Sequence, residues 1–112
     1  MSIEQTDVVD IISTDRLTGH VVLTISDHLD WSDSTAHQML LQTKLNRYLA
    51  FVESGEILES YPDAKDRPIE FKVVFQFPPD DGGQAFLAKV KPIVKSAGFT
   101  LREEVYTGAR FN

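Results

Sequence analysis

Residues 69–77 read Ile69-Glu70-Phe71-Lys72-Val73-Val74-Phe75-Gln76-Phe77. Apolar side chains occupy every second position of this stretch, and the positions between them are mostly polar. Successive side chains of a β-strand point to opposite faces of the sheet, so the alternation predicts a strand with one apolar face and one mostly wet face. A sheet built around such a strand is covered on one side only.

Three more strands are predicted, from an apolar stretch at residues 8–13 and from alternating stretches at residues 20–26 and 99–106. The first two are close in the chain and are separated by polar residues and Gly19, which predicts a hairpin. The strand at 69–77 is expected to stop at Pro78-Pro79, because proline cannot donate a hydrogen bond to a neighbouring strand.

Two helices are predicted from apolar residues spaced three and four positions apart. The first begins near residues 30–36, where several Asp, Ser and Thr residues are suitable N-caps, and it ends at Ser54-Gly55. A short helical turn is expected at 56–61. The second helix ends at residues 96–98, and Pro92 is expected to kink it. The predicted apolar stripes are Leu41, Leu45, Tyr48, Leu49 and Val52 in the first helix and Phe86, Leu87, Val90, Ile93, Val94 and Ala97 in the second.

The predicted element order is therefore ββαβαβ. Each helix has one apolar stripe and the sheet has one apolar face, so the economical arrangement packs both helices on that face. We predict an α+β fold, a two-layer sandwich of a four-stranded mixed sheet with two helices on one face. The rules for crossover connections leave the strand order open. The 112 residues fit a single domain, 1–112, with an ordered core at about residues 7–106 and a tail at 107–112.

Composition excludes several classes of function. The chain has no cysteine, which removes disulfides, cysteine-ligated zinc, iron–sulfur clusters and thiol nucleophiles. Its formal charge of −6 disfavours binding to a phosphate backbone. Residues 1–7 lack a signal-peptide pattern, and the apolar stretches are too short to span a bilayer. We expect a cytoplasmic protein that has no cofactor and binds neither nucleic acid nor membrane.

Three stretches together resemble a bacterial family of small uncharacterised domains, a domain of unknown function. They are Val22-Leu23-Thr24-Ile25-Ser26-Asp27-His28-Leu29-Asp30-Trp31, Leu49-Ala50-Phe51-Val52-Glu53-Ser54-Gly55-Glu56 and Tyr61-Pro62-Asp63-Ala64. The resemblance extends from about Val8 to Val105. It implies a bacterial, cytoplasmic origin, and it brings no catalytic motif because the family has no assigned activity.

The strongest candidate site is the polar segment that follows the strand at 20–26. Sites of α/β proteins often lie where a strand ends and a helix begins. Carboxylates and imidazoles here have the chemistry to bind a divalent cation, or His28 could act as a base oriented by Asp30. The catalytic candidates are His28 and Asp30, and the metal candidates are Asp27, His28, Asp30, Asp33 and His37.

A structural interpretation of the same segment is equally simple. Asp and Ser residues cap helices, Trp31 is suited to anchor the helix start, and His37 falls on or beside the core stripe. The spacing matches no zinc signature. Residues 80–83 likewise lack the spacing and the lysine of a phosphate-binding loop, so they are interpreted as a helix cap.

The wet face of the sheet suggests a different kind of function. Tyr106 is its one aromatic residue and Glu70 and Glu104 oppose a phosphate backbone, unlike the faces of RNA-recognition modules. Val22 and Val74 favour a protein contact there. We hypothesise a non-catalytic protein-binding or regulatory (immunity-like) module that binds a protein partner, or a second copy as a homodimer, through the open sheet face. The alternative is a small metal-dependent or acid/base enzyme that uses the segment from Asp27 to His37.

Overall fold

The computed structural model of the protein describes residues 3–5, 9 and 11–106. Four strands form one sheet in the order β1-β2-β3-β4. β1 is antiparallel to β2, whereas β2 and β3, and β3 and β4, are parallel. The sheet is therefore mixed, and each strand lies beside its neighbour in the chain. The bounds are β1 (Ile11–Thr14), β2 (Val21–Asp27), β3 (Ile69–Phe75) and β4 (Thr100–Val105).

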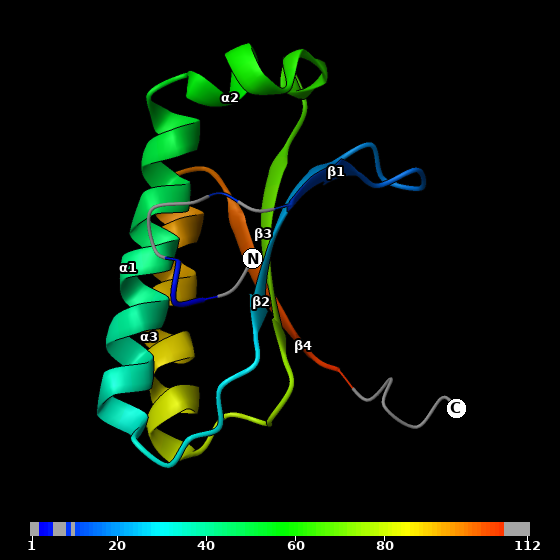
Figure 1. Ribbon diagram of the computed structural model, residues 1–112. Helices are drawn as coiled ribbons and strands as arrows, with labels where there is room; N and C mark the ends of the chain where they lie inside the picture. Colours follow the sequence, from blue (N-terminus) through cyan, green and yellow to red (C-terminus); the bar gives the residue numbers. More distant parts are fainter. Residues whose placement is uncertain (1–2, 6–8, 10, 107–112) are drawn as a thin grey trace.

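Both long helices cover the same face of the sheet (Figure 1). They are α1 (Ser34–Glu53), between β2 and β3, and α3 (Asp81–Ser96), between β3 and β4. A short helix, α2 (Glu56–Ser60), and a 3-10 turn, η1 (Pro62–Ala64), complete the connection from α1 to β3. The predicted two-layer α+β fold and its ββαβαβ order are confirmed.

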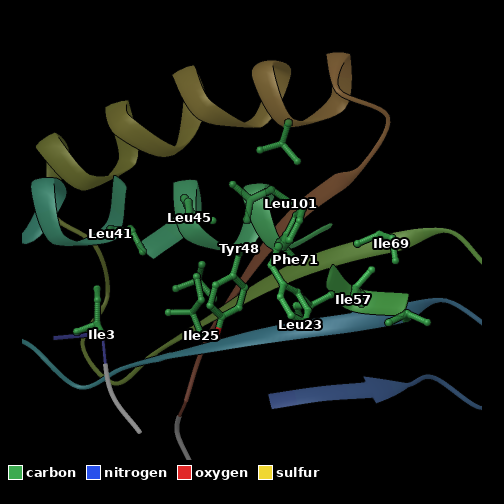
Figure 2. Close-up of a cluster of buried hydrophobic side chains, with 14 of the residues drawn as sticks. Ile3, Leu23, Ile25, Leu41, Leu45, Tyr48, Ile57, Ile69, Phe71 and Leu101 are labelled. Carbon is green, nitrogen blue, oxygen red and sulfur yellow. The ribbon is translucent and has the colours of Figure 1, made fainter. Parts of the chain in front are cut away.

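The core lies between β3 and the helices. Phe71, Val73 and Phe75 are fully buried, and β2 places Leu23 beside Phe71 in the pairing register. Figure 2 shows side chains of α1, α2 and β4 gathered over the same strands. Tyr48 of α1 is fully buried, and its hydroxyl donates to the carbonyl oxygen of Thr24 at 2.9 Å. The alternation at 69–75 thus forms the floor of the core, as its pattern indicates.

The predicted apolar face of β3 is wrong at its last position. Phe77 is 43% exposed because β3 ends at Phe75 and the chain turns away toward Pro78-Pro79. The stripe of α3 is also narrower than predicted. Leu87 and Val94, seven positions apart, face the sheet, whereas Ile93 is 64% exposed and Ala97 is exposed.

A lysine of α1, Lys44, is buried in the core, although a charged residue is expected at the surface. Lys44 is fully buried, and its ammonium group donates to the carbonyl oxygen of Gln5 at 2.6 Å. The Lys44 ammonium also lies 5.6 Å from the ring centre of Tyr48. Leu49 and Val52, predicted as core, are half-buried. Lysine is rarely fully buried unless it is paired, so the position of Lys44 beside the apolar stripe of α1 did not predict its burial.

The ends of several elements differ by a few residues from the predicted ones. β1 ends at Thr14 rather than residue 13, and residues 8 and 10 of the strand predicted at 8–13 lie outside the described residues, as does the tail 107–112. Gly55 follows α1 with φ of 85°, the left-handed conformation predicted for this glycine. Among the described residues, no helix combines the length and apolar character that a membrane span requires.

Candidate functional site

The candidate residues between 27 and 37 lie in two different environments. Asp27 and His37 are buried against each other, with side chains 0% and 2% exposed. His28, Asp30 and Asp33 are exposed. Within the part of the chain that the structure describes, no group of three or more His, Cys, Asp or Glu side chains is placed to hold a metal ion. The five metal candidates are therefore not assembled around one point.

The buried pair forms because β2 and α1 each direct one side chain inward. Asp27 is the last residue of β2 and is paired with Phe75 of β3, whose side chain is fully buried. His37 is in the first turn of α1. Its Nε2 lies 2.5 Å from Oδ2 of Asp27, and the other carboxylate oxygen, Oδ1, accepts the Leu29 N–H at 3.1 Å. Both oxygens of Asp27 are thus used.

The second ring nitrogen of His37 is also used. Nδ1 lies 2.9 Å from the carbonyl oxygen of Asp30, and because a carbonyl oxygen only accepts, Nδ1 carries a proton. A single further proton then lies between Nε2 and Asp27, on the imidazole or on the carboxyl group. In either arrangement the pair is neutral as a whole, and neither nitrogen of His37 is free to take a proton from a substrate.

Trp31 covers the pair. Its ring stacks on His37 with 3.7 Å between ring centres and 18° between planes, and its indole N–H donates to the carbonyl oxygen of Phe77 at 3.2 Å. The start of α3 lies close to the same ring. A Cβ added to Gly83 would be only 2.6 Å from the Trp31 ring. Trp31 therefore joins the end of β2, the start of α1, the end of β3 and the start of α3.

The exposed members of the segment make local contacts. Asp33 is the N-cap of α1 and accepts the Ala36 N–H at 3.1 Å. Asp30 accepts from the hydroxyl of Ser32 at 2.7 Å and from its N–H at 3.1 Å, and these bonds, the hydroxyl first, lower the pKa of Asp30 below its usual value. These contacts match the structural interpretation of the segment as helix capping.

His28 has a different position from that predicted for a base oriented by Asp30. Its side chain is 49% exposed, and its Nε2 lies 3.7 Å from a carboxylate oxygen of Glu4. The carboxylate of Asp30 is bound to Ser32 instead. The two catalytic candidates are therefore neighbours in the chain with separate partners.

A hollow lies on the other, open face of the sheet, at the carboxyl ends of the parallel strands. It measures about 250 Å³. Asp27 contributes to its wall, but the Asp27 side chain is fully buried, so it adds no exposed carboxylate. The lining residues are Ser26, Asp27, His28, Val74, Gln76 and Tyr106. The sequence placed Val74, Gln76 and Tyr106 on the open face, but only the strand order brings them next to His28.

A family model described as "Family of unknown function (DUF6572)" matches residues 1–107. The chain belongs to DUF6572. The resemblance inferred from sequence is thus confirmed, and DUF6572 carries no assigned activity to transfer to any residue. Searches of curated proteins and of solved structures gave no match.

The open face of the DUF6572 chain carries a charge network. Arg102 of β4 donates through Nε to Glu70 of β3 and through Nη1 to Glu104 at 2.7 Å. The hydrogen bond to Glu70 raises the pKa of Arg102 above its usual value, so this guanidinium stays charged. Val22 and Thr24, predicted as wet, are only 5% and 9% exposed. The open face is therefore less exposed to solvent at β2 than its sequence pattern predicted, and the charged residues of this network lie on β3 and β4.

Proposed function

We propose that this protein is a non-catalytic module that binds another protein through the open sheet face, with the hollow receiving a side chain of that partner. The proposal rests on one contrast. The acid–imidazole pair, Asp27 and His37, is buried with both ring nitrogens occupied, whereas Tyr106 at the hollow is 53% exposed. The groups that a partner can reach are therefore suited to a protein contact rather than to acid–base catalysis.

The size of the hollow supports a side chain as its occupant. Its volume of about 250 Å³ is below the range of about 300–1,000 Å³ typical of small-molecule sites. Protein interfaces often place one aromatic or aliphatic side chain in a pocket at their centre, and tyrosine is enriched among the residues that dominate binding energy. Val74 supplies an apolar wall and Tyr106 an aromatic one.

Charge supports a basic partner. The chain carries 17 acidic and 11 basic side chains, and Glu4 and Glu104, which lie near or on this face, are 60% and 48% exposed. Complementary potentials accelerate association and exclude wrong partners. We infer a partner surface with an apolar or aromatic residue flanked by Lys or Arg. A regulatory module of the immunity type would act by covering such a surface.

A library of displayed random peptides tests the proposal. We expect selection on the wild-type protein to enrich an aromatic or large aliphatic residue with basic neighbours. Tyr106→Ala should then weaken binding of the selected peptides by about tenfold, because removing a central interface residue commonly costs 1–2 kcal/mol or more. Ile93→Ala is the matched control, since Ile93 is a large apolar residue of α3, 64% exposed and on the helix layer.

The selected peptides also give the result that would reject the proposal. Selection of peptides with acidic rather than basic residues would contradict a basic partner. Peptides that bind Tyr106→Ala as tightly as wild type while losing affinity for Ile93→Ala would place the contact surface on the helix layer. Circular dichroism of both variants checks that each remains folded.

A further inference from the structure

The outer edge of β4 is a second surface, which borders the open face. β4 is the last strand of the sheet, so the outward backbone groups have no strand partner within the described residues. The Tyr106 N–H donates to the carbonyl oxygen of Phe75 in β3 at 2.6 Å. Backbone groups alternate in direction along a strand, so those of Leu101, Glu103 and Val105 point away from the sheet.

We propose that two copies of this chain pair through these edges as antiparallel strands, with Glu103 opposite Glu103 of the second copy. The two sheets then become one continuous sheet with a two-fold axis at Glu103. In this register Leu101 lies opposite Val105 of the second copy, and each such pair exchanges two backbone hydrogen bonds. The inference concerns the backbone edge of β4 rather than the hollow, and although Glu104 contributes to both surfaces, the pairing does not depend on the proposed function.

Charge complementarity selects this register. With Glu103 on the axis, Arg102 lies opposite Glu104 of the second copy, and the same contact occurs twice. An axis at residue 102 pairs two arginines, and an axis at 103 or 104 pairs two glutamates, so each register has one contact between like charges. Only the axis at 103 adds two Arg102–Glu104 contacts that offset it. Opposite charges directly across a strand pair stabilise it and like charges destabilise it.

The helix side of the edge is compatible with the same pairing. The two Glu103 side chains meet there, but each is already paired with Lys91, whose ammonium lies 2.6 Å from the Glu103 carboxylate. Val105 is 40% exposed and lines a groove of about 370 Å³ beside Leu87 and Ala88 of α3. The backbone of the second copy, with its residue 101 opposite Val105, would pass along the edge of this apolar surface.

The opposite edge of the sheet is less suited to pairing. β1 (Ile11–Thr14) is shorter than β4 (Thr100–Val105). Short edge strands are one way in which proteins prevent edge-to-edge association. β4 is longer and contains no proline or glycine, and its three charged residues include the complementary pair Arg102 and Glu104. The second copy is therefore assigned to β4.

Cysteine cross-linking tests the register directly, because the chain has no cysteine of its own. In the proposed pairing, two copies of Glu103→Cys lie about 5.5 Å apart at Cα, within the range of about 4.4–6.8 Å that a disulfide bridges. Val105→Cys is the matched control. Residue 105 lies four residues along the strand from its own copy, a separation of about 14 Å. Mild oxidation should give a covalent dimer with the first variant and not with the second.

Sedimentation of the full chain tests whether the pairing occurs without a cross-link. Wild type should show a monomer–dimer equilibrium, and Glu104→Arg should weaken the dimer by about tenfold, because Arg102 then faces arginine on both sides of the axis. The double variant Arg102→Glu with Glu104→Arg should restore the dimer if it is folded by circular dichroism. Wild type that stays monomeric at all concentrations, or equal cross-linking of the two cysteine variants, overturns the proposal. The result of the peptide selection with Tyr106→Ala, whatever it is, would leave the cross-linking and sedimentation results unchanged.

Discussion

Asp27 and His37 form a buried contact between the end of β2 and the first turn of α1. The pair closes a hydrogen-bonded chain from the Leu29 N–H through the carboxylate and the imidazole to the carbonyl oxygen of Asp30. Every polar atom of the two side chains has a partner, and Trp31 stacks on the ring. A buried polar group stabilises a fold only when it is satisfied in this way, because an unpaired one costs its desolvation energy.

Removing one member of the pair should therefore destabilise the protein strongly. We expect Asp27→Ala to lower the free energy of unfolding by about 3–5 kcal/mol, the usual cost of removing one partner of a buried acid–base pair. Asp27→Asn should lose less, because its amide can donate to Nε2 of a neutral imidazole. Urea unfolding measures both.

The control for this prediction is the neighbouring histidine. His28→Ala removes a side chain that is 49% exposed, so its effect should stay within about 0.5 kcal/mol. Equal losses for Asp27→Ala and His28→Ala would show that the buried pair contributes nothing beyond a surface contact.

The sequence placed His37 on or beside the core stripe but did not pair it with Asp27. Asp27 continues the buried series Val21, Leu23 and Ile25, but the predicted strand ended at residue 26, which left Asp27 in the polar segment after it. The position of Lys44 was missed for a different reason. Its ammonium group reaches Gln5, far away in the chain, and no local pattern encodes that contact.

At the scale of elements, β3 shows where patterns succeed and where they stop. Its alternation predicted the buried face from Ile69 to Phe75 because an apolar residue recurs at every second position. The pattern continues to Phe77, but the strand does not. The end of a strand depends on its partners, and both β2 and β4 stop pairing with β3 at Phe75.

Two phenylalanines of the same stretch give a matched test of this boundary. Phe75→Ala should lower the free energy of unfolding by about 3–5 kcal/mol, because Phe75 is fully buried. Phe77→Ala should cost much less, since Phe77 is 43% exposed. Thermal or urea unfolding of the two variants measures this difference. A similar loss of free energy of unfolding for both would show that the core extends beyond the end of β3.

The start of α3 has its own requirement for a small residue. Alanine favours helices over glycine by about 1 kcal/mol, so Gly83→Ala would ordinarily stabilise α3. Here the added Cβ would lie 2.6 Å from the Trp31 ring, so we expect destabilisation instead. Gly82→Ala is the control, because the atoms it would meet are the side-chain ends of Gln38 and Ser34. If calorimetry finds a higher melting temperature for Gly83→Ala, the contact with Trp31 is not tight.

At the scale of the whole molecule, the layered fold was predictable and the candidate site was not. Single apolar stripes on two helices and one apolar sheet face have one economical arrangement. The hollow needs the strand order β1-β2-β3-β4, which brings Ser26 of β2 and Val74 of β3 together with Tyr106, the residue that follows β4. Sequence periodicity carries no information about which strands are neighbours.

Metal ions give a test of the alternative function for the molecule as a whole. We expect the same melting temperature with chelator as with excess zinc, manganese or magnesium, because Asp27 and His37 already satisfy each other. A metal that binds only the folded state would add about 2.7 kcal/mol at a hundredfold excess over its dissociation constant, which would raise the melting temperature by several degrees. A rise of that size, lost in His28→Ala, would favour the enzyme.

The stacking of Trp31 on His37 also gives the molecule an optical reporter. Trp31 is the single tryptophan of the chain, so all indole fluorescence comes from the corner where β2, α1, β3 and α3 meet. Emission changes when the ring leaves the imidazole and enters water. Separation of this corner during unfolding is therefore visible as a signal distinct from loss of helix by circular dichroism, and two unfolding curves that do not coincide would reveal a local opening before the global transition.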